Sequence, residues 1–365
     1  MEGSPAAGAT VLVRGDDGTA YGWAAYSPES QIRARMWTFE PDATVDDAFV
    51  TTQVVAAAER RSHLLSSGIT DSARLVFSEA DGVPGLIADL YNDTVVCQLT
   101  TAGAEAWREV LADALAALPG VSSVYERSDA EVRAREGLGA RTGPMAGPAP
   151  ITALVVHEAG FRYAVDIASG HKTGFYLDQR GGRSAVAQWA SGRRVLNVFG
   201  YTGAFSVVAA RCGAESIETI DSSGPALAMA AHNAELNGVD VGELVEADAF
   251  TALRGLRDRA RQYDLILLDP PKLAATEGQV DKASRAYKDL NLLAVKLLAP
   301  GGVLLTWSCS GAMPMELFQK VVAGAALDAN RTVRIIDRLH QPADHPVPLA
   351  FPEAEYLKGL VLQAE

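Results

Sequence analysis

Continuous apolar runs alternate with helix-like segments through the C-terminal half of the chain. Residues 195–198, 216–220 and 263–268 have the length and composition of strands that are buried on both faces. This regular order predicts βαβ units and therefore parallel strands. The helices between these strands are expected at residues 203–212, 225–236 and 249–260.

The alternation continues to the end of the chain. A helix is expected at residues 282–298, a strand ending at Trp307, and a further helix at residues 314–326. Two closing strands, at residues 333–338 and 356–362, are expected to pair with each other. Residues 151–365 are therefore predicted to form one α/β domain.

The N-terminal half has a different pattern. Short strands separated by turns over residues 11–39 predict a small β module in residues 1–44. A helix is expected at residues 45–65, and the strands and helix that follow it predict a middle α/β domain in residues 45–150. Gly, Ala and Pro are frequent in residues 137–150, which are expected to form a linker or an excursion.

Net charge limits the classes of partner. The chain has 365 residues, of which 48% are hydrophobic, and its formal net charge is -13. Because phosphate neutralisation dominates nonspecific binding to nucleic acid, this charge argues against a protein that coats nucleic acid. Charge acts locally, within about 8 Å at physiological salt, so a short basic segment can still bind RNA. Arg33 and Arg35 are candidate residues for that contact.

Cysteine content and hydropathy limit the chemistry and the location that are expected for the protein. Cys97, Cys212 and Cys309 have neither a disulfide framework nor the spacing of metal ligands, so no metal site is expected and at least one thiol is free for chemistry. The contexts of Cys97 and Cys212 are apolar and predict structural roles. The chain begins without an apolar leader and has no apolar run of the ~18 residues that span a bilayer, which makes a cytoplasmic location the default expectation.

A strand that runs into a glycine-containing turn and then into a helix is typical of nucleoside-binding sites. Asn197, Phe199, Gly200 and Gly203 lie in such a turn. The third glycine of the dinucleotide fingerprint and the Gly-Lys-Ser/Thr sequence of a phosphate loop are both missing, which disfavours NAD and ATP.

Acidic residues follow the ends of the neighbouring strands. Asp221 lies about twenty residues after the glycine turn, where a carboxylate receives ribose hydroxyls. Asp248 and Asp269 follow the next two strands, and Asp269 supplies negative potential near a cation. S-adenosylmethionine carries no phosphate and has a sulfonium charge, so it is the expected cofactor, with Asp248 as a polar contact for its adenine.

Cys309 lies in the loop Trp307-Ser308-Cys309-Ser310-Gly311 at the end of an apolar strand. Loops that follow parallel strands share one edge of the sheet, so Cys309 and Asp269 are expected to face one crevice. Carbon 5 of a cytosine or uracil is too electron-poor to attack a sulfonium methyl directly, and a thiolate that adds to carbon 6 activates it. Cys309 is therefore predicted to be a catalytic nucleophile.

The loop Asp269-Pro270-Pro271-Lys272 supplies further candidates. Pro270 and Pro271 stiffen the loop and fix a backbone carbonyl toward the target base. Lys272 could hold a phosphate or favour the thiolate. Asp269 and Lys272 are both candidate acceptors for the proton that leaves carbon 5.

These loops, together with other segments along nearly the whole chain, resemble the bacterial 23S ribosomal RNA (cytosine-5)-methyltransferases. The specific segments are the two catalytic loops and Lys172-Thr173-Gly174-Phe175-Tyr176-Leu177-Asp178-Gln179-Arg180. The resemblance implies an N-terminal PUA domain, a middle α/β domain and a C-terminal class I, Rossmann-like methyltransferase domain. Val11 lies only ten residues from the start, so the N-terminal module is expected to be a truncated form of the PUA domain.

The resemblance also implies roles and partners. Cys309 would be the nucleophile. Residues 172–180 would border the pocket of the methyl donor and contribute cofactor contacts. The substrate would be 23S ribosomal RNA, either protein-free or in an early assembly intermediate, and the protein would form a homodimer. The cofactor contacts implied by this segment are Tyr176, Asp178, Gln179 and Arg180.

Three other functions stay open at this point. A uracil-5 methyltransferase has similar proline and cysteine loops. A purine N-methyltransferase would use the same fold and leave Cys309 incidental. A noncatalytic RNA-binding or ribosome-assembly factor could hold S-adenosylmethionine without turnover, although such a module has no need of a thiol.

Overall fold

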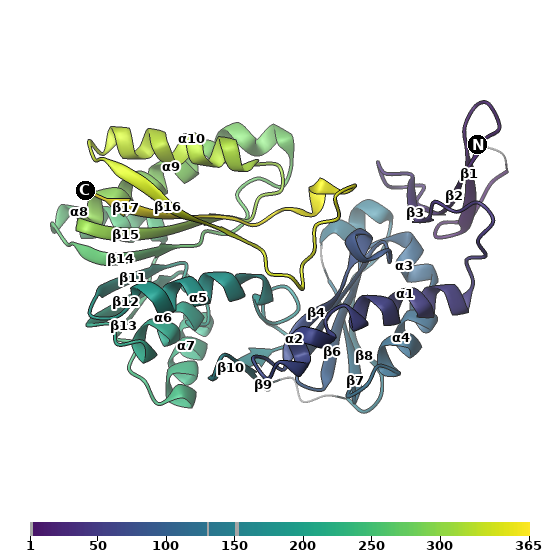
Figure 1. Cartoon of the computed structure of the whole chain (residues 1–365), viewed down its shortest axis with the longest axis horizontal. Coiled ribbons are helices and arrows are strands. Elements are labelled where there is room, and N and C mark those ends of the chain that lie inside the picture. The colour runs from purple at the N-terminus through teal and green to yellow at the C-terminus, as the bar shows by residue number, and fades with distance from the viewer. Residues whose placement is uncertain (1–2, 130, 150–152) are drawn as a thin grey trace. The chain divides into compact units, whose positions relative to one another are not determined.

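The computed structural model describes residues 3–129, 131–149 and 153–365 (Figure 1). The chain forms two compact units. Unit 1 comprises Met1–Gly160, Ala164–Leu177 and Ala343–Phe351. Unit 2 comprises Phe161–Tyr163, Asp178–Pro342 and Pro352–Glu365. Within the described residues, no helix combines the length and hydrophobicity needed to cross a membrane.

Unit 1 begins with an antiparallel sheet in the order β1-β2-β3. This sheet confirms the short N-terminal strands expected from the sequence. Trp37 of β3 is buried and meets Trp107 edge-on, with ring centroids 6.5 Å apart. The strands are β1 (Thr10–Arg14), β2 (Ala20–Tyr26) and β3 (Ala34–Thr38).

A five-stranded sheet in the order β4-β5-β6-β7-β8 forms the rest of unit 1. β6 and β7 are parallel, and the other neighbours are antiparallel. Apolar side chains of α1 and α4 pack with those of the sheet in one buried core. The elements are α1 (Asp47–Glu59), α2 (Ser62–Ser66), β4 (Ser72–Phe77), β5 (Leu86–Tyr91), β6 (Thr94–Leu99), α3 (Ala102–Ala106), α4 (Arg108–Ala116), β7 (Ser123–Ser128), β8 (Arg141–Ala146) and β9 (Ala153–Glu158).

The single helix expected at residues 45–65 is instead two helices, α1 and α2. Arg61, between them, is buried, and its guanidinium donates to the carbonyl oxygens of Ala57 and Arg74. Two further bonds, of 2.8 and 2.6 Å, go to the carboxylate of Asp81. The helix ends where this side chain turns inward, which the hydrophobic pattern could not show.

The structure also differs in part from the linker or excursion expected at residues 137–150. Residues 141–146 form β8, which pairs with β7 at the edge of the sheet. Pro144 lies opposite Tyr125. Proline is tolerated there because one side of an edge strand needs no ladder hydrogen bonds, so the composition resembles that of a loop.

Unit 2 contains a seven-stranded sheet in the order β13-β12-β11-β14-β15-β17-β16. The first five strands in this order are mutually parallel, whereas β17 is antiparallel to both of its neighbours. The expected pairing of the last two strands is confirmed. The strands are β11 (Arg194–Val198), β12 (Ser216–Asp221), β13 (Glu243–Glu246), β14 (Tyr263–Leu268), β15 (Leu298–Ser308), β16 (Val333–His340) and β17 (Lys358–Ala364), and β10 (Phe161–Asp166) pairs with β9.

Alternate residues of the central strands enter two helical layers. Ile266 and Leu268 of β14 join the core formed with α8, α9 and α10, whereas Leu265 and Leu267 join the core formed with α5 and α6. A strand covered on both faces explains the uninterrupted apolar run. The helices are α5 (Arg180–Trp189), α6 (Ala204–Arg211), α7 (Gly224–Asn237), α8 (Ala249–Asp258), α9 (Val280–Leu297) and α10 (Met315–Asp328).

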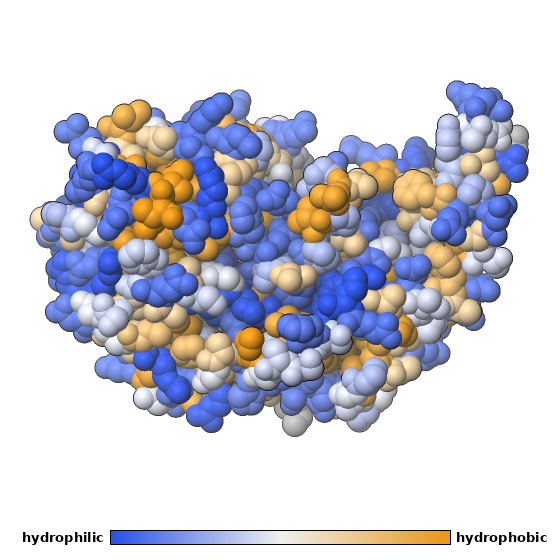
Figure 2. Space-filling view, viewed as in Figure 1, coloured by the Kyte–Doolittle hydropathy of each residue, from blue (hydrophilic) through white to orange (hydrophobic). Residues whose placement is uncertain are grey.

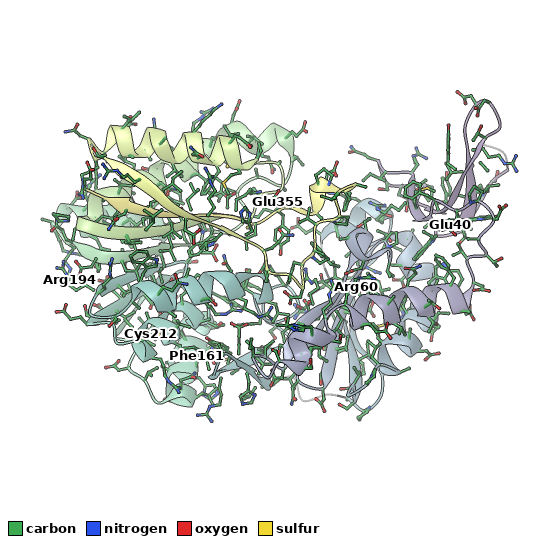
Figure 3. All side chains as sticks on the ribbon, viewed as in Figure 1. Glu40, Arg60, Phe161, Arg194, Cys212 and Glu355 are labelled. Carbon is green, nitrogen blue, oxygen red and sulfur yellow. The ribbon has the colours of Figure 1, made fainter. Side chains whose placement is uncertain are left out.

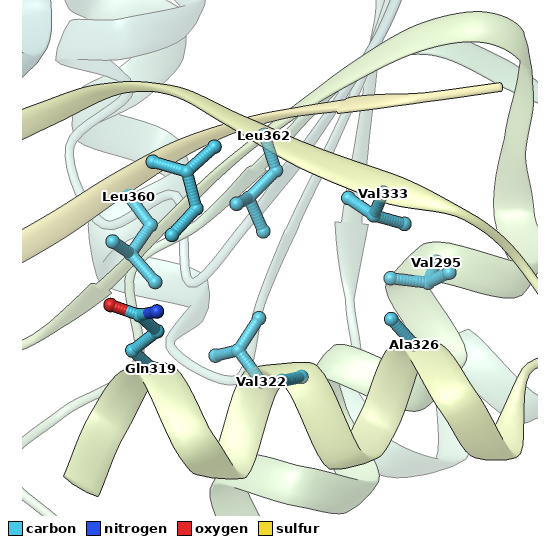
Figure 4. Close-up of a pocket in the computed structure, with 9 residues that line it drawn as sticks. Val295, Gln319, Val322, Ala326, Val333, Leu360 and Leu362 are labelled. Atoms are coloured by element: carbon cyan, nitrogen blue, oxygen red, sulfur yellow. The ribbon is translucent and has the colours of Figure 1, made fainter. Parts of the chain in front are cut away.

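The outer edge of this sheet is partly apolar. Figure 2 shows hydrophobic surface over the position of β16, where Ile335 and Ile336 are 37% and 40% exposed. An apolar pocket of about 160 Å³ lies between α9, α10, β16 and β17, with Gln319 as a polar lining residue (Figure 4). None of the predicted site residues lines this pocket.

Substitution of Arg61 is expected to destabilise unit 1 far more than substitution of Arg60. Both guanidinium groups contact Asp81, but the side chain of Arg61 is 2% exposed and that of Arg60 is 49% exposed. Arg61→Ala leaves a buried carboxylate short of charge compensation, at a cost of about 3 kcal/mol. Arg60→Ala should cost less than about 1 kcal/mol. Urea denaturation measures both, and equal losses would contradict the assignment.

Candidate active site

The turn between β11 and α6 is shaped by two glycines. Gly203 has a φ of 75°, and a Cβ atom there would lie 2.6 Å from the Cβ of Ala230. A Cβ on Gly200 would lie 2.3 Å from Cγ2 of Thr219. Packing therefore excludes a side chain at both positions, and the positive φ disfavours one at Gly203 as well. Phe199 and Tyr201 in the same turn also have positive φ values, of 63° and 47°.

Asp221 joins this turn to the next one. Its Oδ2 accepts a hydrogen bond from the backbone N–H of Tyr201 at 2.8 Å, and its Oδ1 accepts one from that of Ser223 at 2.9 Å. The carboxylate thus ties together the loops that follow β11 and β12. An ionised carboxylate has about four acceptor positions, so Asp221 keeps the capacity to accept hydroxyl groups.

Asn197 supports the turn from behind. The residue is fully buried, and its Nδ2 donates to Oγ of Ser206 at 2.8 Å. Ser206 and Thr219 share a further hydroxyl bond of 2.7 Å. This chain links β11, α6 and β12 beneath the glycines. The structure gives Asn197 a packing role, and its contact with the cofactor stays a prediction.

Asp248 has a local task in the structure. It is exposed and precedes α8, and its Oδ1 accepts hydrogen bonds of 2.9 Å from both the backbone N–H and the hydroxyl of Thr251. This is an ordinary helix N-cap, which satisfies an N–H in the first turn of α8. The predicted contact between Asp248 and adenine would have to use the remaining acceptor positions of the carboxylate.

Asp178 and Gln179, immediately before α5, form hydrogen bonds with other loops of unit 2. Gln179 is 4% exposed, and its Nε2 donates to Oδ2 of Asp269 at 2.8 Å. Asp178 is 2% exposed and accepts a 2.6 Å bond from the hydroxyl of Tyr356. Asp178 and Gln179 therefore attach the start of α5 to the loops after β14 and before β17. The resemblance implied that both residues border the donor pocket, whereas Tyr356 was expected only as the start of a closing strand.

Cys309 follows β15 and is held between two buried serines. The hydroxyl of Ser308 donates to the Tyr287 hydroxyl at 3.0 Å, and Oγ of Ser310 accepts from the backbone N–H of Ala274 at 3.1 Å. The hydroxyls of Ser310 and Tyr287 also lie 3.2 Å apart. Cys309 itself is partly exposed. A fixed backbone therefore carries an accessible thiol.

Lys358 lies beside this loop and was not among the predicted residues. It is 3% exposed, and its Nζ donates to the carbonyl oxygen of Ser310 at 2.8 Å. Burial lowers the pKa of Lys358 to about 8, although Coulomb attraction to Cys309 opposes the shift. A lysine at the start of an apolar strand was the available signal, because such a charge is rarely buried without a partner.

The other two cysteines differ from Cys309. Cys97 in β6 is buried, and burial, with a smaller effect of Glu126, raises the pKa of its thiol to about 12. Cys212 is the C-cap of α6 and packs at the edge of a hydrophobic core (Figure 3). These surroundings match the structural roles expected for Cys97 and Cys212.

The remaining candidates divide between the units. In unit 2, Pro270 is buried, whereas Pro271 and Lys272 are exposed and Arg180 is partly exposed. In unit 1, the Lys172 ammonium lies 4.2 Å from the ring centroid of Tyr176. The N-terminal arginines, Arg33 and Arg35, also differ: Arg33 is exposed, but Arg35 forms ion pairs with Glu79 and Glu136 at 3.3 and 2.8 Å.

The groups gathered in unit 2 suit a cationic ligand that carries hydroxyl groups. Asp178, Asp221 and Asp269 supply carboxylates in the loops described above. Buried acceptor atoms without a hydrogen-bond partner among the described residues include Oε1 of Gln179 and Oγ1 of Thr202. S-adenosylmethionine, with its sulfonium, its amino group and its ribose, matches these donors and acceptors.

Comparison with known proteins agrees with this chemistry. Residues 139–362 match the S-adenosylmethionine-dependent methyltransferase family. The ribosomal RNA large subunit methyltransferase I of Aeromonas salmonicida (strain A449) is 48% identical over 100% of this chain and 92% of its own length. The protein of the same name from Shewanella denitrificans is 48% identical over 98% of this chain and 91% of its own length.

Solved structures show the same fold. A protein described as a methyltransferase in complex with SAH has a TM-score of 0.86 at 23% identity, covering 98% of this chain and 91% of the other. A Streptococcus mutans protein described as a SAM-dependent methyltransferase has a TM-score of 0.86 at 22% identity, covering 99% and 93%. The predicted α/β fold with a Rossmann-like methyltransferase domain is confirmed. The family match and the 48% identity over the whole chain establish the family. This chain belongs to the S-adenosylmethionine-dependent methyltransferases, its relatives include the ribosomal RNA large subunit methyltransferase I proteins, and its cofactor is S-adenosylmethionine.

Proposed function

We propose that this enzyme methylates carbon 5 of a cytosine in the 23S RNA of the large ribosomal subunit, with Cys309 as the nucleophile. The observation that carries the proposal is a partly exposed thiol on a rigid loop at the carboxyl end of β15. The loop after the adjacent parallel strand, β14, carries Asp269. The relatives named ribosomal RNA large subunit methyltransferase I support a ribosomal RNA substrate.

The chemistry follows from the needs of the pyrimidine ring. The Cys309 thiolate forms a bond to carbon 6, and the electron pair of the 5,6 double bond makes carbon 5 nucleophilic. S-adenosylmethionine supplies the methyl group that carbon 5 accepts. A base then removes the proton from carbon 5, the double bond re-forms, and the thiolate leaves. Asp269 and Lys272 are the proposed acceptors of that proton.

The other predicted residues keep supporting roles in this proposal. Asp221 would accept hydrogen bonds from ribose hydroxyls while it holds the two adjacent turns in place. Pro270, Pro271 and Lys272 would contact the target nucleotide. The proposed cofactor contacts are Tyr176, Asp178, Gln179, Arg180, Asn197, Phe199, Gly200, Gly203, Asp221, Asp248 and Asp269.

RNA recognition would extend into unit 1. The β1-β2-β3 sheet would act as a PUA-like module within residues 1–44, ahead of a middle domain over residues 45–150 and a catalytic domain over residues 151–365. Arg33 is exposed and suits a phosphate contact, whereas the ion pairs of Arg35 give it a structural task as well. The proposed setting is the cytoplasm, with protein-free 23S RNA or an early assembly intermediate as substrate and a homodimer as the assembly.

Cys309→Ala is expected to abolish methyl transfer but leave S-adenosylmethionine binding within about twofold, because the thiol acts only on the base. Cys212→Ala is the matched control and should retain activity. The assay incubates unmodified large-subunit RNA with labelled S-adenosylmethionine and identifies the product by nucleoside mass spectrometry. 5-methylcytidine produced by Cys309→Ala would overturn the mechanism, and label in 5-methyluridine or a methylpurine would overturn the product.

Asp221→Asn is expected to weaken S-adenosylmethionine binding by about tenfold or more, because hydrogen bonds to a charged acceptor contribute about 1.5–3 kcal/mol. Asp258→Asn changes an exposed carboxylate at the end of α8 and serves as the control. Isothermal titration calorimetry measures both dissociation constants. Equal affinities in the two variants would show that Asp221 does not bind the cofactor.

A further inference from the structure

Lys358 occupies a position set by the sheet. β15 and β17 pair antiparallel, and Ser308 lies directly opposite Lys358. Lys358 is the first residue of β17, and its partner Ser308 is the last residue of β15, directly before Cys309. Its Nζ reaches the carbonyl oxygen of Ser310, one residue beyond Cys309, at 2.8 Å. Register and hydrogen bond together keep the amino group at this loop.

A lysine that is 3% exposed requires a compensating negative charge or must lose its proton. Two acidic groups raise the pKa of Lys358, with Cys309 the larger contributor and Glu355 the smaller. Glu355, which is labelled in Figure 3, is half-exposed. Its Oε1 lies 3.3 Å from Nδ1 of His340. The nearby ammonium of Lys272 acts in the opposite direction. Of these two acidic groups, Cys309 has the larger effect on Lys358.

Tyr287 is a further titratable group that contacts this loop. Its hydroxyl bonds to Ser308 and Ser310, and burial raises its pKa. The phenol therefore stays neutral over the working range of an enzyme and cannot balance the lysine. Its effect is to fix the backbone on both sides of Cys309.

We propose that Lys358 is the charge partner that generates and holds the Cys309 thiolate, an inference that rests on the proposed role of Cys309 as the nucleophile. One proton moves from Sγ of Cys309 to Nζ of Lys358, which converts a thiol and an amine into a thiolate and an ammonium. The thiolate then adds to carbon 6 of the base, and its later departure restores the same pair. Lys358 is thus a positioning residue that acts through Cys309.

Burial of Lys358 favours its neutral amine, which is the form that can accept the thiol proton. Once the proton has moved, Coulomb attraction in a poorly solvated site stabilises the pair of thiolate and ammonium. Nearby cations are a known cause of reactive thiolates.

The test measures the pH dependence of Cys309 alkylation by iodoacetamide in the full-length enzyme, with peptide mass spectrometry to separate the three thiols. In the wild type, half-maximal alkylation of Cys309 is expected at least one pH unit below the value of about 8.5 for an ordinary cysteine. Lys358→Met should raise this pH by at least one unit and slow alkylation at pH 7.5 by about tenfold. Lys358→Arg keeps a cation at this position, so it should keep alkylation half-maximal at low pH although a guanidinium cannot itself accept the thiol proton.

Two controls isolate the effect. Alkylation of Cys212 in the same samples should be unchanged by the substitutions and reports on folding. Lys320→Met makes the same change at an exposed residue of α10 and should leave the Cys309 profile at the wild-type value.

The outcomes separate this proposal from the proposed function. A wild-type Cys309 profile at or above pH 8.5, or identical profiles in the wild type and Lys358→Met, would overturn the role of Lys358 even if Cys309→Ala is inactive. A shifted profile together with an active Cys309→Ala variant would instead confirm the charge pair and overturn Cys309 as the nucleophile.

Discussion

Parallel pairing of β13, β12, β11, β14 and β15 is the constraint on which the site depends. Strands that run in one direction end at one edge, so the loops after them meet there. In this chain those loops carry Asp221, Asp269 and Cys309. Removal of either helical layer would expose the apolar strands, so the same burial that stabilises the sheet also keeps the chemical groups together.

The sequence predicted this arrangement well because it depends on local pattern. Buried parallel strands are continuous apolar runs, and the residue after each run is the one expected to face a ligand. Asp221 illustrates the success, since its position alone indicated its place beside the glycine turn. The two-helix form of residues 45–65 was not predictable in this way, because it results from the contact of Arg61 with Asp81, twenty residues away.

Long-range partners account for the other omissions. The Tyr287 hydroxyl, the Tyr356 bond to Asp178 and the Lys358 bond to Ser310 join segments that are far apart in the chain. No periodicity encodes such pairs. A lysine within an apolar strand was a usable signal, because a buried charge requires a partner, but the sequence could not name that partner.

Unit 1 contains buried charged side chains that contact residues 164–177 and 343–351, two segments that precede site residues along the chain. Thr173 donates to Asp89, which is also paired with Arg74. Asp344, from the segment 343–351, accepts from the backbone N–H of Arg74, and its carbonyl accepts from Arg61. Residues 164–177 and 343–351 continue in the chain to Asp178 and to the strand that begins with Lys358. The buried network thus fixes residues 164–177 and 343–351 within unit 1.

The central claim is a covalent bond between Cys309 and carbon 6 of a cytosine. The most direct measurement offers the enzyme and S-adenosylmethionine large-subunit RNA in which cytidine is replaced by 5-fluorocytidine. Fluorine cannot leave carbon 5 as a proton does, so the adduct formed after methyl transfer should persist through denaturation. We predict a methylated, cross-linked nucleotide on the peptide that contains Cys309. Methyl transfer to normal RNA without such an adduct, or an adduct at another residue, would contradict the account.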